Sequence, residues 1–324
     1  MVYSVLICKT GCAVMKTVFV INPNAGKKKN IKNLIEKINE VSLNLNSDSE
    51  VYITKRQGDA ETFVRNYCEE KGAARFIACG GDGTLSEVLN GAINFEDAEI
   101  GVMPIGTGND FCRNFKNIDF KDIKSQFLSH TRKCDAIKYT DKNVTRFGVN
   151  MFNIGFDCNV ADMKEKLTKK TFLKGSLAYF IAIFIILVKK KGANLKIVAD
   201  GTEKHNGKLL LTSLANGSFC GGGIMSNPLA DLNDGLININ IVKNVSRLRF
   251  ITLLPFYMNG KYIKLKNIDK IITTEKYKKI VITPLDNEMR LCTDGEISTV
   301  GETTFEIQHN AFNLVVPQYT SCII

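Results

Sequence analysis

The stretch Arg75–Gly91, RFIACGGDGTLSEVLNG, decides the fold of the first part of this chain. Arg75–Cys79 is short and largely apolar, which predicts a buried strand. Thr84–Ala92 predicts a helix, and the loop between the two is made of three glycines and one aspartate. A strand that passes through glycines directly into a helix is the opening of a βαβ unit.

The same alternation of strand and helix continues on both sides of this stretch. Apolar residues occur either in short runs or at helical spacing. This βαβα order predicts a parallel sheet covered by helices. Right-handed crossovers then place every strand-to-helix loop at one edge of the sheet, where ligands bind in such folds. The expected strands are Thr17–Asn22, Val51–Thr54 and Glu99–Met103. Three further helices are expected: one over residues 31–41, one with Asp59 as its N-cap and one that starts at Asn109.

Three glycine-containing loops fall at this predicted ligand edge: Asn22–Lys27 (NPNAGK), Gly80–Thr84 (GGDGT) and Gly106–Asp110 (GTGND). Glycine lets the backbone approach a ligand closely, and N–H groups before a helix form a phosphate cradle. The carboxylate of Asp82 inside such a cradle is favourable if Mg²⁺ lies between it and the phosphates. One such loop alone would be interpreted as a tight turn, but three in succession favour phosphate binding. No Walker pattern is present, and the first turn has no G-x-G-x-x-G dinucleotide fingerprint.

After about residue 134 the pattern changes to short segments that alternate apolar and polar residues. Asp-Gly pairs at Asp200, Asp234 and Asp294 signal hairpin turns between them. This half predicts a mainly antiparallel β-sandwich, with helices near 161–190 and 247–260. The expected fold class is therefore α/β plus β, with a Rossmann-like three-layer nucleotide domain over 15–136 and a sandwich domain over 137–310. Residues 311–324 are candidates to pack back on the first domain, and residues 1–14 either add a strand or precede a true start at Met15.

The composition indicates a globular chain with an anionic partner. The formal net charge is +10, which points to nucleotide phosphates, nucleic acid or an anionic lipid surface. The chain has no tryptophan and its aromatic residues are not interleaved with its lysine runs, which argues against nucleic acid. Ten cysteines without a C-x-x-C pair, and three histidines, argue against a zinc site or a disulfide framework. Scattered thiols fit a cytoplasmic location.

Several of these stretches resemble one family when taken together. Gly80–Gly91 resembles the signature of the diacylglycerol kinase catalytic domain, which is shared with sphingosine and ceramide kinases. The resemblance continues in order from about Met15 to the C-terminus. Its other motifs are Asn22–Lys27 (NPNAGK), Pro104–Arg113 (PIGTGNDFCR), Phe152–Cys158 (FNIGFDC), Asn216–Gly235 (NGSFCGGGIMSNPLADLNDG) and Thr293–Glu296 (TDGE).

The resemblance implies an ATP- and Mg²⁺-dependent lipid kinase with its active site in the cleft between the two domains. Diacylglycerol, converted to phosphatidic acid, is the leading candidate acceptor. Glu296 would be the general base and Asp82 a second catalytic carboxylate. A structural Mg²⁺ would be held by Asp234 and by the carbonyls of Asp231 and Leu236. The nucleotide contacts expected from the loops and the resemblance together are Asn22, Pro23, Asn24, Ala25, Gly26, Thr54, Gly80, Gly81, Asp82, Gly83, Thr84, Leu85, Ser86, Glu87, Gly106, Thr107, Asn109 and Asp110.

The residues alone support these roles less strongly. An acid such as Glu296 beside an Asp-Gly turn is usually only solvated, and Asp231 and Asp234 are commonly capping residues. Other hypotheses are an NAD kinase-like or other small-molecule kinase of the same superfamily, and a regulatory module that binds nucleotide without turnover. A regulatory module should have lost Asp82 or Glu296, and both are present.

A membrane partner is expected for a lipid kinase. The longest apolar run, Leu177–Val188, is shorter than the ~20 residues of a membrane-spanning helix. Lysines at 164, 166, 169, 170, 174 and 189–191 flank it. They form either a solvated face or a basic collar that holds an anionic bilayer, so that the protein is peripheral to the membrane. A homodimer is compatible with the sequence.

Overall fold

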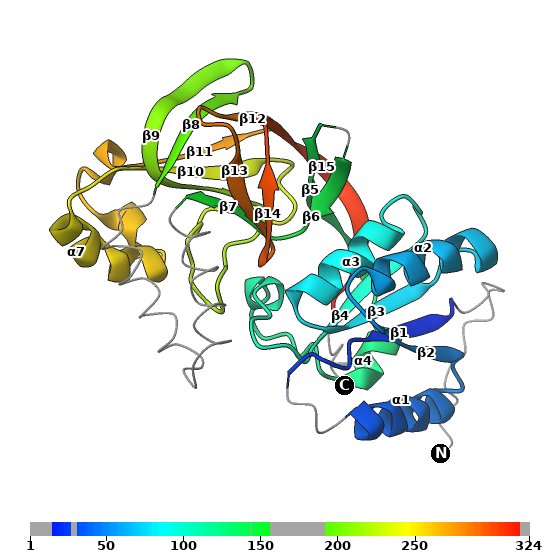
Figure 1. The fold of residues 1–324 in the computed structure, drawn as a ribbon. Coiled ribbons are helices and arrows are strands. Elements are labelled where there is room, and N and C mark those ends of the chain that lie inside the picture. The colour runs from blue at the N-terminus through cyan, green and yellow to red at the C-terminus, as the bar shows by residue number, and fades with distance from the viewer. Residues whose placement is uncertain (1–14, 27–30, 143, 156–191, 318–324) are drawn as a thin grey trace.

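The computed structural model describes residues 15–26, 31–142, 144–155 and 192–317 (Figure 1). Three sequence predictions therefore lie outside the described residues: the role of residues 1–14, the helix near 161–190 with its lysine collar, and the packing of residues 318–324. Within the described ranges, no helix is both long enough and apolar enough to span a bilayer.

The first domain is a parallel sheet between two layers of helices. Strands β1 (Thr17–Ile21), β2 (Ser49–Ile53), β3 (Arg75–Gly80) and β4 (Glu99–Pro104) pair in the order β2-β1-β3-β4. Every residue of β1 is buried, as expected for a strand covered on both faces. The predicted three-layer α/β architecture is thus confirmed (Figure 1).

Alternate residues of β1 point to different helix layers. Val18 and Val20 pack with helices α2 (Asp59–Lys71) and α3 (Asp82–Ala92). Phe19 and Ile21 pack with helices α1 (Ile31–Leu45) and α4 (Ile123–Leu128). The two apolar clusters hold the sheet rigidly, so the loops at the C-terminal ends of its strands are held in place relative to one another.

Two predicted helix starts differ from the structure. The N-cap of α2 is Gly58, with φ of 80°, and Asp59 is the first helical residue. The Asp59 carboxylate turns back and accepts from the Lys55 N–H, at 2.8 Å, instead of capping its own helix. Asn109 has φ of 53°, and the chain after it forms only a 3₁₀ turn, η1 (Phe111–Asn114).

The second half is an antiparallel sandwich, as predicted (Figure 1). It also carries helix α7 (Arg247–Met258) and the 3₁₀ turns η2 (Lys261–Lys264) and η3 (Ile268–Lys270). Its core is an aliphatic and aromatic cluster that includes Phe152, Leu214 and Phe305. The strands are β5 (Thr131–Asp141), β6 (Val144–Gly148), β7 (Met151–Gly155), β8 (Ala193–Ala199), β9 (Thr202–Ala215), β10 (Ile237–Lys243), β11 (Ile272–Tyr277), β12 (Lys279–Pro284), β13 (Met289–Thr293), β14 (Glu296–Val300) and β15 (Thr303–Val315).

Two of the three predicted Asp-Gly hairpins are present. Asp200 and Asp294, each followed by a glycine, have positive φ and join β8 to β9 and β13 to β14. The turn at Asp234 does not join two adjacent strands: it precedes β10, which pairs with the distant β9. The buried carboxylate of Asp135 accepts from the N–H of Gly235 at 2.8 Å and holds this turn from outside.

Strand β15 belongs to both domains. Its first part pairs antiparallel with β5 and β12, and its end pairs in parallel with β4 through Asn313 and Leu314. The register shifts between Gln308 and Phe312, where Asn310 has φ of 56°. A strand shared in this way couples the orientation of the sandwich to that of the parallel sheet.

Helices α2 and α3 pack closely at Gly91, which gives a test of this layer. A β-carbon on Gly91 would lie 2.6 Å from the carbonyl oxygen of Glu61 and 2.9 Å from Cβ of Val64. Alanine in place of a helical glycine ordinarily stabilises by about 1 kcal/mol, but overpacking costs ~1–3 kcal/mol. We expect Gly91→Ala to lower the melting temperature, measured by circular dichroism, whereas Lys37→Ala on the exposed face of α1 leaves it unchanged. A higher melting temperature for Gly91→Ala would contradict this packing.

Candidate active site

A cavity of about 610 Å³ lies where the two domains meet. The first domain contributes the three glycine loops and the segment that joins β2 to α2. The second domain contributes the turn between β13 and β14. The lining residues are Asn22, Asn24, Ala25, Gly26, Thr54, Arg56, Gln57, Ala60, Gly81, Asp82, Gly83, Thr84, Glu87, Gly106, Thr107, Gly108, Asp294, Gly295 and Glu296.

The three loops pack against each other so closely that two of their glycines leave no room for a side chain. A β-carbon on Gly106 would lie 2.5 Å from Cα of Gly81. A β-carbon on Gly26, which has φ of 67°, would lie 2.1 Å from the carbonyl oxygen of Ile105. These contacts bring three backbone segments to one face of the cavity, with little side-chain bulk in front of them.

The N-terminus of α3 opens into the cavity. Gly81 is its N-cap, and Asp82, Gly83 and Thr84 form its first turn, so all four residues lie on the lining. The first N–H groups of a helix have no acceptor within the helix, and the helix dipole makes this end partially positive. The arrangement is suited to bind the phosphates of a nucleotide.

Glu296, the first residue of β14, faces this helix end from the other domain. Its Oε1 accepts from Nε2 of Gln57 at 3.2 Å, and a β-carbon on Gly83 would lie 3.3 Å from the same oxygen. Desolvation and the nearby Glu87 carboxylate raise the pKa of Glu296, whereas Arg146 and Gln57 act in the opposite direction. A raised pKa makes a carboxylate a stronger base, as proton abstraction from an alcohol requires.

Asp294 holds Glu296 in place. Its Oδ1 accepts from the N–H of Met151 at 2.7 Å and of Asn150 at 3.2 Å, and its Oδ2 accepts from the N–H of Val149 at 2.9 Å. These bonds attach the β13–β14 turn to the link between β6 and β7. Desolvation outweighs the three hydrogen bonds and raises the pKa of Asp294 to about 7.

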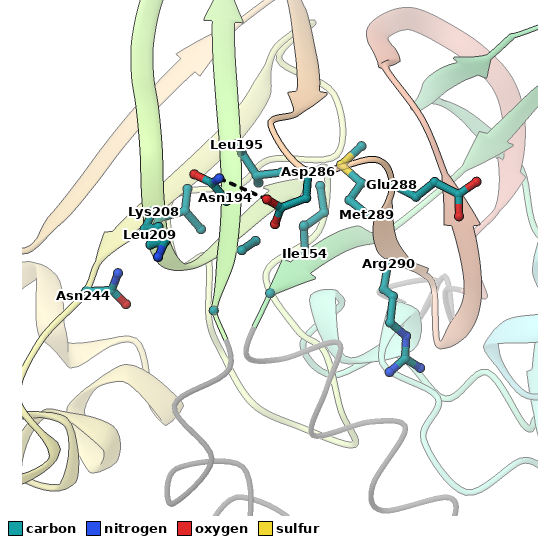
Figure 2. A pocket seen from close by; sticks show the side chains of 13 residues that line it. Ile154, Asn194, Leu195, Lys208, Leu209, Asn244, Asp286, Glu288, Met289 and Arg290 are labelled. Atoms are coloured by element: carbon teal, nitrogen blue, oxygen red, sulfur yellow. Dashed lines mark hydrogen bonds between the residues drawn. The ribbon is translucent and has the colours of Figure 1, made fainter.

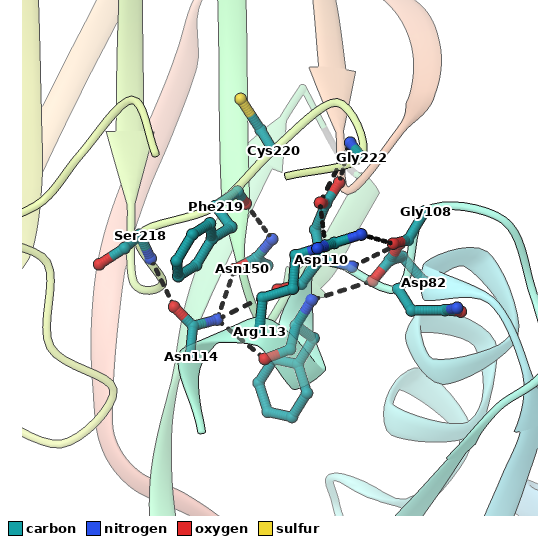
Figure 3. Close-up of polar contacts among 12 residues, drawn as sticks. Asp82, Gly108, Asp110, Arg113, Asn114, Asn150, Ser218, Phe219, Cys220 and Gly222 are labelled. Atoms are coloured by element: carbon teal, nitrogen blue, oxygen red, sulfur yellow. Dashed lines mark hydrogen bonds and ion pairs between the residues drawn. The ribbon is translucent and has the colours of Figure 1, made fainter. Parts of the chain in front are cut away.

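Asp82 has a structural role in addition to its place in the cavity. Its carboxylate oxygens accept from the N–H groups of Asp110 and Phe111, both at 3.1 Å, and thereby cap η1. Asp110 in turn accepts from the N–H of Gly222 in the second domain, at 2.8 Å from its Oδ2. Figure 3 shows these groups in one network that joins the glycine loop to the sandwich.

Asn114 and Asn150 complete this network. Oδ1 of Asn114 accepts from the N–H of Ser218 at 2.7 Å, and Nδ2 of Asn150 donates to the carbonyl of Phe219 at 2.6 Å. The segment from Ser218 to Gly222 is therefore fixed against η1 by hydrogen bonds to side chains of both domains (Figure 3).

Not all predicted nucleotide-binding residues line the cavity. Pro23, Gly80, Leu85, Ser86, Asn109 and Asp110 are absent from its lining. Leu85 is buried in the core of the first domain, and the Asp110 carboxylate points to Gly222. Conversely, six lining residues were not among the predicted site residues, although Gly108 lies in a loop predicted to bind phosphate: Arg56, Gln57, Ala60, Gly108, Asp294 and Gly295. Asp294 is part of the TDGE motif, so the motif could have identified it as a site residue, but from the sequence alone Asp294 is interpreted only as a turn residue.

The residues predicted to hold a structural Mg²⁺ are engaged in other contacts. Asp231 accepts from the N–H of Asn233 at 3.0 Å. Asp234 accepts from the N–H of Leu236 at 3.0 Å and forms an ion pair with Lys276 at 2.5 Å. These contacts use the carboxylates of Asp231 and Asp234 and the N–H of Leu236, whereas the predicted ligands are the Asp234 carboxylate and the carbonyls of Asp231 and Leu236. The Mg²⁺ site at this turn therefore stays a prediction. In the described part of the chain, no three acidic, histidine or cysteine side chains converge as metal ligands.

A second cavity, of about 390 Å³, lies in the sandwich between β7, β8, β9 and β13 (Figure 2). Apolar side chains such as Ile154 and Leu209 share its lining with the charged Lys208 and Arg290. Asn194 donates to Asp286 across it at 3.3 Å. It is separate from the cavity that contains Glu296, with which it shares no lining residue.

Comparison with known proteins identifies the family. Residues 16–139 match the model of the diacylglycerol kinase catalytic domain, and residues 150–316 match that of the YegS C-terminal NAD kinase beta sandwich-like domain. The chain belongs to the diacylglycerol kinase catalytic-domain family of lipid kinases, which are phosphotransferases with an alcohol acceptor. The family expected from the sequence motifs is thus confirmed.

Individual relatives agree with this assignment. A diacylglycerol kinase of Staphylococcus haemolyticus is 29% identical over 283 residues, which cover 86% of this chain and 81% of that protein. A diacylglycerol kinase of Mycobacterium tuberculosis is 29% identical over 209 residues, or 63% and 65% of the two chains. The crystal structure of a diacylglycerol kinase from Bacillus anthracis has the same fold, with a TM-score of 0.67 and 22% identity over 93% of this chain and 97% of that one.

The anchoring role of Asp294 can be tested through stability. Asparagine has only one carbonyl oxygen, so Asp294→Asn should lose at least one of the three bonds and leave a backbone N–H facing an amide NH₂. Such a loss typically costs ~1–3 kcal/mol. We expect a lower free energy of unfolding in urea than for wild type, and no change for the control Asp269→Asn, which alters an exposed residue of η3.

The pH dependence of this difference follows from the pKa of about 7. Between pH ~4, where an unfolded aspartate titrates, and the folded pKa, Asp294 holds a proton that the unfolded chain has lost. Its contribution to stability is therefore fully present below pH ~4 and is lost as the pH rises through the folded pKa. As the pH rises over this range, the difference in free energy of unfolding between wild type and Asp294→Asn should become smaller. A difference that grows with pH would contradict the raised pKa.

Proposed function

We propose that this protein transfers the γ-phosphoryl group of ATP to the hydroxyl of a lipid, with diacylglycerol as the first candidate acceptor. One observation carries the proposal: the carboxylate of Glu296, from the sandwich, faces the N-terminus of α3, from the nucleotide domain, in a single cavity. A base placed opposite a phosphate-binding helix end is the arrangement that phosphoryl transfer to an alcohol requires.

The two sides of the cavity have different roles in the proposed reaction. The glycine loops and the N-terminus of α3 bind and orient the phosphates, and Glu296 accepts the proton of the acceptor hydroxyl. A bond forms between the acceptor oxygen and the γ-phosphorus while the bond from that phosphorus to the leaving oxygen of ADP breaks. Because the transition state of such a transfer is loose, positioning and charge neutralisation supply most of the catalysis.

The charge of the lining supports a metal ion in the reaction. Asp82, Glu87, Asp294 and Glu296 line the cavity, and Arg56 is the one basic residue among its lining residues in the described part of the chain. ATP brings further negative charge. Mg²⁺ is commonly held by one or two carboxylates together with substrate phosphates, so the cavity fits it without a complete protein cage. Asp82, at the helix end, is the carboxylate that would share the ion, which would neutralise phosphate charge.

The acceptor class comes from the family and its relatives. The model of the diacylglycerol kinase catalytic domain and the relatives named diacylglycerol kinases support a lipid alcohol as the acceptor. The lipid must be reached in a membrane, so we propose that the protein acts as a peripheral enzyme at a bilayer surface. A panel of acceptors that includes NAD separates this proposal from the NAD kinase-like alternative.

Removal of the base gives the decisive variant. Glu296→Gln keeps the shape of the side chain and its bond to Gln57 but removes its basicity. We expect kcat for lipid phosphorylation to fall by ~10²–10⁴-fold, with the Kd for ATP close to the wild-type value. The acid limb of the wild-type pH–rate profile, where the rate falls as the pH drops through the raised pKa of Glu296, should disappear in the variant.

The control for this variant is Glu302→Gln, which changes an exposed carboxylate just after β14. It should retain wild-type kcat and pH profile. An unchanged kcat in Glu296→Gln would overturn the assignment of the base. Loss of ATP binding together with kcat, in a variant that is folded by circular dichroism, would instead show that Glu296 acts in nucleotide or metal binding.

Metal removal tests the charge argument. In the presence of EDTA, ATP should bind more weakly, because its phosphates then face the acidic lining without a counter-ion, and lipid phosphorylation should cease. Excess Mg²⁺ should restore both, and isothermal titration calorimetry measures the first. Equal ATP affinity with and without Mg²⁺ would show that the cavity binds the phosphates through its own groups alone.

A further inference from the structure

Helix α7 exposes apolar side chains on the face that points away from the protein. Leu248 is 74% exposed, Ile251 53% and Phe256 41%, and Ile263 in the following η2 turn is 36% exposed. At helical spacing, Leu248, Ile251 and Phe256 lie on the side opposite the buried Leu253 and Tyr257. Figure 1 shows α7 on the side of the sandwich away from α1 to α4.

This face cannot be buried by a rotation of the helix, because the other face is already packed. Phe250, Leu253 and Tyr257 are buried, and Phe250 and Tyr257 belong to a cluster with Val242 and Ile272 of the sandwich strands. The side chain of Ser246 caps the helix by accepting from the N–H of Arg249 at 3.3 Å. A group of exposed apolar side chains on one helix face marks an interaction site, so a surface outside the described fold is expected to cover the outer face.

The charges around this face identify the kind of partner. Residues 243–270 contain seven lysines and arginines and a single acid, Asp269. All seven basic residues are exposed: Lys243, Arg247, Arg249, Lys261, Lys264, Lys266 and Lys270. A second copy of this chain in a two-fold dimer would bring the same basic patch against itself, which is repulsive. An apolar face with a basic rim matches the interface of an anionic bilayer, where basic side chains reach the headgroups.

We propose that the outer face of α7, with the flanking basic residues of segment 243–270, docks this protein on an anionic lipid bilayer. The proposal rests on the proposed function only in the choice of a bilayer as the site of the acceptor. This membrane-docking face is distinct from the lysine collar of residues 164–191, which lies outside the described part of the chain.

Hydrogen bonds connect the membrane-docking face to the active site. The carbonyl of Met258, at the end of α7, accepts from the N–H of Met225 at 2.9 Å. Cys220 and Ile224 then pair as a short antiparallel bridge, and Gly222 between them donates to Asp110. Asp110 is the last residue of the loop whose first three residues, Gly106 to Gly108, line the cavity. A bilayer bound to α7 would therefore be held in a fixed position relative to Asp82.

The test is co-sedimentation of the full chain with vesicles, without nucleotide. Wild type should bind vesicles of phosphatidylcholine mixed with phosphatidylglycerol, and bind vesicles of phosphatidylcholine alone more weakly. The attraction should weaken with salt, because the Debye length falls from ~10 Å at ~0.1 M to ~3 Å at ~1 M. Leu248→Glu/Ile251→Glu should reduce affinity for the anionic vesicles about tenfold or more, since it places acids in the apolar face.

A matched control introduces the same charges elsewhere. Leu128 and Val144 are 56% and 61% exposed, and Leu128→Glu/Val144→Glu should bind vesicles as wild type does. Lys261→Glu/Lys264→Glu is a second test that changes only the basic rim, and it should also weaken binding to anionic vesicles. Circular dichroism confirms that each variant is folded.

Several outcomes would overturn the proposal. Wild-type affinity in both α7-region variants, or no binding of wild type to anionic vesicles at low salt, would exclude the membrane-docking face. Light scattering gives a further test. If Leu248→Glu/Ile251→Glu dissociates a dimer and leaves vesicle binding unchanged, a second copy of the chain covers this face and the proposal is wrong. Kinase activity on a water-soluble short-chain acceptor should be normal in the α7 variants, and Glu296→Gln should still bind vesicles, so failure of this proposal is distinguishable from failure of the proposed function.

Discussion

Three backbone N–H groups, from Val149, Asn150 and Met151, converge on the carboxylate of Asp294, and the position of Glu296 depends on this interaction. Glu296 starts a strand two residues later and has one hydrogen bond through its carboxylate, to Gln57, among those identified. Its backbone is therefore located by the turn and not by contacts of its own side chain. Fixing that turn requires the Asp294 carboxylate to be desolvated, which raises its pKa to about 7. In the proposed reaction, this arrangement would hold Glu296 as the base opposite the helix end that binds the phosphates.

The second requirement is that the two domains hold a constant orientation. Strand β15 pairs with β5 and β12 in the sandwich and with β4 in the parallel sheet. A hinge motion between the domains would therefore have to break hydrogen bonds between β15 and one of these strands. Closer to the cavity, the carboxylates of Asp82 and Asp110 link α3, η1 and Gly222 in sequence. Asp82 thus links helix α3 to the position of the sandwich. If Asp82 takes part in nucleotide binding as we propose, the bound nucleotide would contact this same network of hydrogen bonds.

The sequence predicted those features that depend on local patterns. Glycines between strand and helix at Gly80–Gly83 predicted the α/β fold and the convergence of the loops, because parallel strands end at one edge of a sheet. Features set by distant partners were not predictable in this way. Asp294 was interpreted as a turn residue because its acceptor role depends on N–H groups more than 140 positions away. The Asp234 turn looked like a hairpin because the bond from Gly235 to Asp135 cannot be seen in the local sequence. Gly58, and not Asp59, caps α2 because the Asp59 carboxylate is drawn to Lys55.

The central claim is that one cavity presents the γ-phosphate of ATP to Glu296. A crystal structure with Mg²⁺ and a non-hydrolysable ATP analogue tests it most directly. The account predicts phosphates against the amides of Gly81 to Thr84, with the γ-phosphate on the side of Glu296 and space for an acceptor hydroxyl between them. A nucleotide bound elsewhere, or one whose γ-phosphate points away from Glu296, would contradict it.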